Sequence, residues 1–559
     1  MRIALVHGYL LRGTGSNLYV QNLCRELCHL GHDVILFCQE PDTREFDFVA
    51  SAAEFDHSNL GYQVLYERAT SFKGKCAFFR PNLRGFLPVY VYDRYEGYQV
   101  KELTQLNRDE IEHYLEMNRL ALATVFTSHK PDLILTNHTI MQPVYTARAI
   151  ADAGMACPHF ITVHGSCLNF SVRKSALLQE YALEAISAAD KIIFLSNFSR
   201  QEFSDFFDDV ADLNIKAVVI PAGVDVKKFS PLIAGENKDG RINLLVTNLR
   251  QSTKNGKGRT ANEKERFAEA VAAAKTESEI AALINDTRNK TDNWSTDRDA
   301  PETLAAINWP GSQILLYYGK YLWTKGIQLL IAAAPLVLQK NQDTYFVLVG
   351  FGSQRGYLEA LAAALEYGRR DLFCDLLAHP DKYDSEVEPA SARYFAVLLE
   401  KLRDKKFSDV YFNAAYQNIS KRIVFTGYMN HDDLSNLIPC SDITLATSIF
   451  PESFGMVAVE ALASGIIPIQ TNHSGFADMI RDYVDEIRDT FDATRLKPLL
   501  LNKQLAIDLA GNINVQLGYY QSMSPARRQE LRQRAQRITL DKYSWNSMAG
   551  KYISLYQER

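Results

Sequence analysis

The stretch "SIFPESFGMVAVEALASGIIPI", Ser448 to Ile469, decides the fold and carries two glutamates, Glu452 and Glu460, in a run of small and apolar residues. Charged side chains are seldom fully buried without a partner, so each carboxylate needs a partner or an exit to water. "DITLATS" (442–448) is typical of a buried strand, and "FGMVAVEALAS" of a helix that Gly465 ends. Glu452 then precedes the helix, and Glu460 lies about two turns into it.

The same order of strand, loop and helix recurs on both sides of a break near 221–231. Alternating strands and helices predict an α/β fold of two doubly wound parallel sheets, covered by helices on both faces. We expect one domain at 1–224 and a second at 225–542, with a helix at about 543–559 that packs back on the first. The expected strands are at 2–8, 32–38, 131–137, 159–165, 191–197 and 216–223, then at 313–321, 344–352, 422–428, 442–448 and 466–472.

Composition indicates a globular protein of a reducing compartment. Of the 559 residues, 47% are hydrophobic and 23% charged, and the net charge of −5 gives no attraction to nucleic acid. The 8 cysteines are scattered without a CxxC pair, as buried free thiols are. We find no cleavable leader and no run of about 18–20 apolar residues that could span a bilayer. We therefore expect a cytoplasmic protein without a nucleic-acid partner.

Two polar stretches, 250–308 and 366–420, interrupt the second half and are expected to be insertions. They are either solvated helical decorations or elements for acceptor binding or oligomer contact. The acidic run "DKYDSE" (381–386) is interpreted as a solvated loop, and no carboxylate cluster has metal-ligand spacing, so we expect no metal.

Ligands of open α/β sheets bind at the carboxyl ends of the strands, so the loops that follow the strands are the candidate site. Lysines beside a helix N-terminus suit a diphosphate, and glycines let backbone N–H groups approach a phosphate. A lone histidine is most often structural, although one at a strand's carboxyl end favours function. The loops carry Gly13 and Gly15, His164, Lys320 and Lys325, and Gly350 and Gly352.

The two glutamates of the first stretch fit the two ends of one nucleotide-sugar. One carboxylate can hold a sugar hydroxyl while the other receives a ribose diol. Backbone N–H groups of Phe454, Gly455 and Met456 would then face the phosphates between them.

A dinucleotide-binding dehydrogenase is the alternative that the first loop offers. Gly13 and Gly15 begin a GxGxxG pattern, but Leu18 stands where the third glycine belongs. Glu40 mimics the acid that binds a ribose in such enzymes. This alternative does not explain why the second half of the chain has a strand-and-helix pattern and candidate loops of its own.

The E-x7-E spacing in "PESFGMVAVEALASG" resembles the signature of retaining glycosyltransferases of family 4, which have the GT-B architecture of two facing Rossmann-like domains. Other segments resemble the family in its own order and cover most of the chain outside the two insertions. They are "GHDV", "FLSNFSRQEF", "VIPAGVD", "GKYLWTKG", "LVGFGS", "IVFTGYMNHDDL" and "YSWNSMAGKY".

The resemblance implies a role for each candidate residue. Lys325, with Lys320 beside it, would bind the leaving diphosphate, while Glu452 would bind hydroxyls of the transferred sugar and Glu460 the ribose. His164 would lie beside the sugar ring. The Gly13–Gly15 loop would line the diphosphate and acceptor, and the loops around Gly352 and Thr426–Tyr428 would face the nucleobase.

The resemblance also implies transfer with retention of anomeric configuration, without a metal or a cofactor. Lysines and the helix dipole would take the place of a metal. The chain departs from the family in Lys320, where arginine is usual, in Thr14 between the glycines, and in the long 250–308 insertion.

Residues 62–101 combine aromatic and basic side chains and offer two interpretations. Aromatic faces suit sugar stacking, and basic groups suit phosphates or anionic lipid headgroups, which would allow peripheral contact with a membrane. The alternative is an excursion of the first domain with its own small core. The residues are Tyr62, Phe72, Phe78, Phe79, Phe86, Tyr90, Tyr92 and Tyr95, with Lys73, Lys75, Arg80 and Arg84.

We therefore expect a glycosyltransferase that moves a hexose from a UDP-, GDP- or ADP-sugar to a hydroxyl of a sugar, lipid or small-molecule acceptor. Two alternatives stay open: a sugar phosphorylase or nucleotide-sugar epimerase on the same architecture, and a catalytically silent nucleotide-sugar binding protein.

Overall fold

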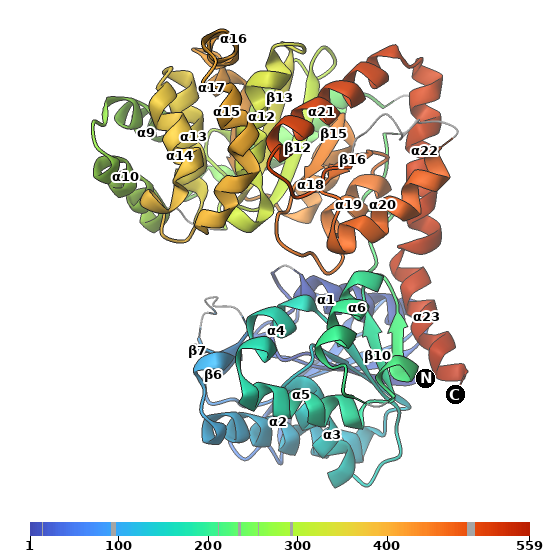
Figure 1. Cartoon of the computed structure of the whole chain (residues 1–559). Helices are drawn as coiled ribbons and strands as arrows, with labels where there is room; N and C mark the ends of the chain where they lie inside the picture. Colours follow the sequence, from blue (N-terminus) through green and yellow to red (C-terminus); the bar gives the residue numbers. More distant parts are fainter. Residues whose placement is uncertain are drawn as a thin grey trace. The chain divides into compact units, whose positions relative to one another are not determined.

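The structure, a computed structural model, describes residues 1–558 apart from 14, 91–94, 96, 211, 233–235, 255, 291–293 and 489–497. Thr14 and Tyr92, both considered above, lie outside the described residues. The chain divides into two compact units (Figure 1). Unit 1 is Met1–Gly223 with Lys542–Arg559, and unit 2 is Val224–Asp541.

Unit 1 is built on a sheet in which nine described strands run in the order β11-β10-β9-β8-β1-β2-β5-β3-β4. All neighbours pair in parallel except β3 and β4, which are antiparallel. The strands are β1 (Arg2–Val6), β2 (Asp33–Phe37), β3 (Val49–Phe55), β4 (Tyr62–Glu67), β5 (Cys76–Arg80), β8 (Leu133–Asn137), β9 (His159–Val163), β10 (Lys191–Phe194) and β11 (Ala217–Val219).

Helices cover both faces of this sheet. Figure 1 shows α2 (Arg108–His129), α3 (Gln142–Asp152) and α5 (Ala176–Ala188) together on one side of it. Helix α2 begins where Asn107 and Glu110 each accept a hydrogen bond from the other's backbone N–H, at 2.9 and 3.0 Å. The other helices are α1 (Ser16–His29), α4 (Gly165–Phe170), α6 (Asn197–Phe206), α7 (Leu213–Lys216) and α23 (Trp545–Gln557).

Helix α23 belongs to unit 1 although it lies at the far end of the chain. It packs beside α1, and the Tyr552 hydroxyl lies 2.7 Å from the hydroxyls of both Tyr19 and Thr162. Gly223 leaves room for Trp545, since a Cβ on Gly223 would lie 2.5 Å from the indole ring.

The 62–101 region is largely part of the fold of unit 1. Strands β4 and β5 extend the main sheet, and β6 (Phe86–Val89) pairs with β7 (Gln99–Glu102) in a separate two-stranded sheet. Phe78, Phe79 and Tyr90 are buried, so they are core residues and not a surface for sugar stacking. The side chains of Lys73, Lys75 and Arg84 are exposed.

Unit 2 is built on a parallel sheet with the order β14-β13-β12-β15-β16 among its described residues. The first strand in the chain, β12, lies at the centre, which is typical of a doubly wound sheet. The strands are β12 (Gln313–Lys320), β13 (Thr344–Phe351), β14 (Ile423–Gly427), β15 (Ile443–Ala446) and β16 (Pro468–Gln470). The structure thus confirms the predicted α/β class of parallel sheets.

Helices also cover both faces of this second sheet. Helix α12 (Ile327–Leu338) packs against α21 (Leu505–Ser522), α13 (Arg355–Glu366) and α16 (Lys405–Ala415). The other helices are α8 (Lys238–Thr253), α9 (Ala261–Ala273), α10 (Glu277–Lys290), α11 (Ala300–Ala305), α14 (Arg370–Ala378), α15 (Ala396–Lys401), α17 (Ile419–Arg422), α18 (His431–Leu437), α19 (Met456–Ala463), α20 (Ser474–Ile487) and α22 (Pro525–Lys542).

The two polar stretches pack into the body of unit 2 and are more than solvated decorations. Helices α9 and α10 lie against α13, and their Val271 and Ile284 are fully buried in the core of this unit. In the second stretch, Phe373 and Tyr411 are fully buried in the same core. The polar residues of these segments therefore form their outer faces, while their apolar residues join the core of unit 2.

No helix in the described part of the chain is both long and apolar enough to cross a membrane.

Candidate active site

An ion pair between Lys325 and Glu452 lies at the carboxyl edge of the unit 2 sheet. Lys325 follows β12 and Glu452 follows β15, and these two strands are neighbours in the sheet. The Lys325 ammonium bonds to the Glu452 carboxylate, and both side chains are partly exposed, at 35% and 19%. The pair therefore presents one positive and one negative group to a ligand at this edge.

Backbone contacts hold these two loops together. The Thr324 carbonyl accepts from the Ile449 N–H at 2.8 Å and from the Ser448 hydroxyl at 3.0 Å. Between Thr324 and the helix α12, Gly326 has a φ of 68°, and a Cβ there would lie 2.1 Å from the Thr447 carbonyl oxygen. The positions of Lys325 and Glu452 are thus set by backbone as well as by charge.

The first turn of α20, the helix that follows β16, fixes the backbone of Glu452. The Glu452 N–H donates to the Ser474 hydroxyl at 3.0 Å, and the Gly475 N–H donates to the Glu452 carbonyl at 2.8 Å. Gly455 precedes α19 with a φ of 101°, where a Cβ would lie 2.2 Å from the ring of Phe476. Met456, the first residue of α19, is partly exposed, while Phe454 is buried.

Glu460 is buried in the second turn of α19, among polar and charged side chains. Its carboxylate lies 3.5 Å from His431 Nε2, and the side chain is 5% exposed. Burial raises the pKa of Glu460 to about 8, although a hydrogen bond with Tyr318 and the charge of Lys228 lower it. Burial also lowers the pKa of His431 to about 4, so His431 is a neutral neighbour at pH 7.

Lys320 ends β12, and Gly352 directly follows the neighbouring strand β13. Lys320 is the last residue of β12 and is partly exposed. Gly352 follows β13 with a φ of 146°, and a Cβ there would lie 2.5 Å from the Tyr321 carbonyl oxygen. In this structure, Gly352 therefore lets the loop after β13 approach the loop after β12, whereas from the sequence we expected it to let the backbone approach a ligand.

Tyr428 follows β14 and contacts a residue that the sequence interpretation left out. Its ring lies 5.6 Å from Phe351 and 5.2 Å from Trp294, which comes from the 250–308 stretch. Trp294 is 47% exposed. A large aromatic residue in an otherwise polar stretch could have indicated this contact from the sequence alone.

In unit 1, His164 is one of three histidines that directly follow neighbouring strands. His7 follows β1, His138 follows β8 and His164 follows β9. His164 Nε2 lies 3.0 Å from Asn137 Oδ1, and the rings of His138 and His164 are 4.9 Å apart. Burial lowers the pKa of His164 to about 3 and of His7 to about 4, so both are neutral at pH 7. His7 and His138 were not predicted, although "VHG" occurs after both β1 and β9.

The Gly13–Gly15 loop of unit 1 is held by Glu40. The Glu40 carboxylate accepts from the N–H groups of Leu11 and Arg12 at 3.0 and 3.2 Å and is 1% exposed. Gly15 directly precedes α1 with a φ of 63°, and beyond its chain neighbours no atom of the described residues lies within 4 Å of its Cβ position. Because Glu40 is buried on this loop, it cannot serve as a ribose acid, and the dehydrogenase alternative loses its support.

Two family models match the chain, one in each unit. The model "Glycosyltransferase Family 4" matches residues 13–228, and "Glycosyl transferases group 1" matches 300–374 and 407–497. Together they match more than half of the chain. The chain belongs to the GT-B glycosyltransferases. The unmatched residues 229–299 and 375–406 overlap the two stretches expected to be insertions.

Solved structures show the same fold. A sucrose-phosphate synthase from Thermosynechococcus elongatus is 17% identical, with all of this chain and 98% of that one covered and a TM-score of 0.50. An alpha,alpha-trehalose-phosphate synthase (UDP-forming) from Burkholderia vietnamiensis is 12% identical, with coverage of 100% and 97% and a TM-score of 0.52.

One curated relative matches part of this glycosyltransferase. It is an uncharacterized glycosyltransferase of Methanocaldococcus jannaschii, 23% identical over 175 residues. The match covers 31% of this chain and 31% of the relative.

Proposed function

We propose that the chain is a retaining glycosyltransferase that moves a hexose from a nucleotide-diphospho-sugar to a hydroxyl of an acceptor. The observation that carries the proposal is the Lys325–Glu452 pair at the carboxyl ends of adjacent strands. In the absence of a ligand the two groups neutralise each other. A donor diphosphate would form an ion pair with the Lys325 ammonium, and a sugar hydroxyl would donate a hydrogen bond to the Glu452 carboxylate. Both charged groups would then keep a partner when the ligand binds.

In this reaction the bond from the anomeric carbon to the diphosphate oxygen breaks, and a bond to the acceptor oxygen forms. The acceptor proton passes to the departing diphosphate. Lys325, with Lys320 beside it, stabilises the negative charge that develops on the leaving group, as a metal would do in other enzymes. Glu452 orients the sugar through its hydroxyls, and Glu460 receives the ribose diol.

The neutral histidines of unit 1 fit a role in hydrogen bonding and not in charge stabilisation. With a pKa of about 3, His164 remains an uncharged imidazole across the working pH range. A neutral ring can donate or accept one hydrogen bond, for example with a sugar hydroxyl.

The test is product analysis with a panel of donors and acceptors. UDP-glucose comes first because the Burkholderia neighbour is named as UDP-forming, followed by GDP-mannose and ADP-glucose. Acceptors include sugar phosphates and, since Lys73, Lys75 and Arg84 are exposed on unit 1, a lipid-linked sugar. Proton NMR of the product should show the donor's anomeric configuration, and activity should persist in EDTA.

The same assay separates the alternatives. A phosphorylase would release sugar 1-phosphate only when inorganic phosphate is present, and an epimerase would convert the donor without any acceptor. Inverted configuration in the product would overturn the retaining proposal, and a requirement for a divalent cation would overturn the role given to the lysines.

A further inference from the structure

The 250–308 stretch places an exposed aromatic side chain at the carboxyl edge of the unit 2 sheet. The Trp294 ring lies 4.6 Å from the ring of Phe351 and 5.2 Å from that of Tyr428. Phe351 ends β13 and Tyr428 follows β14, and these strands are neighbours. Phe351 is 8% exposed, whereas Trp294 is 47% exposed. The cluster thus packs one part of the indole and leaves another part open to solvent.

The backbone that follows Trp294 pairs with the end of β14 much as a neighbouring strand would. The Tyr428 N–H donates to the Ser295 carbonyl at 3.1 Å, and the Thr296 hydroxyl donates to the Tyr428 carbonyl at 2.6 Å. Thr296 also forms an isolated antiparallel bridge with Gly427. These bonds set the register between Trp294 and Tyr428, so the indole does not depend on a loose loop for its position.

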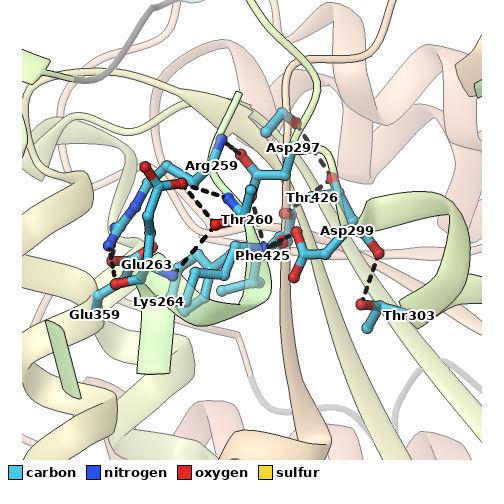
Figure 2. A network of polar contacts seen from close by, with 12 residues as sticks. Arg259, Thr260, Glu263, Lys264, Asp297, Asp299, Thr303, Glu359, Phe425 and Thr426 are labelled. Carbon is cyan, nitrogen blue, oxygen red and sulfur yellow. Dashed lines mark hydrogen bonds and ion pairs between the residues drawn. The ribbon is translucent and has the colours of Figure 1, made fainter. Parts of the chain in front are cut away.

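A buried ion network anchors the same segment to the body of unit 2. Arg355 forms two hydrogen bonds to the Asp297 carboxylate, at 2.8 and 2.6 Å, and both side chains are at most 2% exposed. The Asp297 N–H donates to the Thr426 carbonyl at 2.8 Å. Figure 2 shows how Lys264 reaches from α9 to the Phe425 carbonyl and to Asp299, at 2.8 and 2.7 Å. Charged side chains are seldom fully buried unless they are paired, as Asp297 and Arg355 are.

We propose that Trp294 is the stacking surface for the nucleobase of the donor, supplied by the 250–308 stretch. The inference rests on the proposed function. The aromatic cluster lies at β13 and β14, which are one and two strand spacings of about 4.8 Å from β12, the strand that precedes Lys325. The proposal places the nucleoside of a donor whose diphosphate is bound at Lys325 on this side of β12. An aromatic face stacks on any base, and the fixed Tyr428 backbone lies beside it.

In this proposal, the ion network around Asp297 positions Trp294, and Trp294 contacts the base. Asp297 and Arg355 do not touch the proposed ligand themselves. Their function is to hold the peptide from Ser295 to Asp297 against β14, so that the indole stays fixed before the nucleotide arrives.

Calorimetric titration of the full chain with UDP, GDP, ADP and inorganic pyrophosphate tests the inference. Trp294→Ala should weaken the binding of the nucleoside diphosphate that the wild type prefers by about 5- to 100-fold, since base–aromatic stacking is lost. Binding of pyrophosphate should not change. Trp294→Phe should recover most of the affinity, and Tyr367→Ala, at a 41% exposed tyrosine of the same unit, is the matched control.

Each result has a distinct meaning. The stacking role is overturned, and the proposed function left intact, if Trp294→Ala binds the nucleotide as tightly as wild type does. The same holds if the substitution lowers the affinities for the nucleotide and for pyrophosphate by the same factor. A wild-type chain that binds none of the four ligands overturns both. Circular dichroism of each variant excludes loss of fold as the cause of weaker binding.

Discussion

The Lys325 ammonium is paired with the Glu452 carboxylate although the two residues lie 127 positions apart in the chain. They meet because β12 and β15 are neighbours in a parallel sheet, and both side chains come from loops at its carboxyl edge. The contact joins two loops and places opposite charges where ligands of such sheets bind.

Lys325→Met should lower kcat by about 10²–10³-fold, because the charge that stabilises the leaving diphosphate is lost. The exposed Lys340, in the same unit, provides the control as Lys340→Met. Steady-state kinetics on the best donor of the panel measures both. Equal turnover by the two variants would remove Lys325 from the proposed chemistry.

Glu460→Gln should change the pH dependence of stability. The folded state holds the Glu460 proton more tightly than the unfolded chain, with a pKa of about 8 against an ordinary value of 4.5. The stability that the proton contributes is therefore complete below about pH 4.5 and is lost as pH rises through 8. The variant has no such loss, so its Tm should exceed that of wild type by an increasing margin between pH 5 and 8. Thermal denaturation in that range measures the margin, and a constant difference contradicts the assignment.

Nucleotide affinity should respond to the same group in the opposite direction. A ribose diol donates hydrogen bonds to an ionised carboxylate, so the Kd of the preferred nucleoside diphosphate should fall as pH rises through about 8. The dependence should vanish in Glu460→Gln. Titrations at several pH values test this, and an unchanged pH slope in the variant would show that another group is responsible.

Asp297→Asn should cost up to about 3–5 kcal/mol of folding free energy, because the buried Arg355 would keep only Glu359 as a carboxylate partner, and Lys264 only Asp299. Burial acts to raise the pKa of Asp297, but Arg355 and Lys264 hold it below its usual value. Denaturant unfolding measures the loss. The exposed pair Arg527–Glu530, 3.1 Å apart, is the control, and Glu530→Gln should cost less than about 1 kcal/mol.

Gly455→Ala should destabilise the protein by about 1–3 kcal/mol, since alanine at a φ of 101° is strained and its Cβ would meet Phe476. Gly518→Ala in the interior of α21 is the counterpart. Among the described residues, no atom outside the backbone of its own helix lies within 4 Å of its Cβ position, so alanine there should be neutral or stabilise by about 0.5–1 kcal/mol. A Gly455→Ala variant as stable as wild type would show that the loop before α19 can take another shape.

The sequence was sufficient to predict the strands that carry the candidate site and to place Lys325 and Glu452 after them, because buried parallel strands and the helices between them leave clear periodic patterns. It did not predict β3 to β7, which lie between the second expected strand and α2. It could not predict that the two side chains touch, since the order of strands in a sheet is a tertiary property. The aromatic residues of 62–101 were misleading for the same reason. Phe78 and Phe79 look like a binding surface until β5 is known to lie inside the main sheet.

The 250–308 stretch was underestimated because its composition hid its pattern. Phe267 and Val271, like Ile280 and Ile284, stand four residues apart, which is the spacing of one helix face. Their burial against α13 and the pairing of Asp297 with Arg355 could be seen only in three dimensions. His7 and His138 were not considered from the sequence, because only the strand order of the sheet places the ends of β1 and β8 beside that of β9, which His164 follows.

Thermal stabilisation by UDP, GDP, ADP and their glucose or mannose conjugates tests the central claim most directly, with wild type and Lys325→Met measured side by side. A nucleotide that binds only the folded state at 100 times its Kd adds about 2.7 kcal/mol, which gives a readable shift in Tm. We predict a shift with one nucleotide and its sugar conjugate in the wild type, and a much smaller one in Lys325→Met. No shift with any ligand, or equal shifts in both proteins, would contradict a donor site at Lys325 and Glu452.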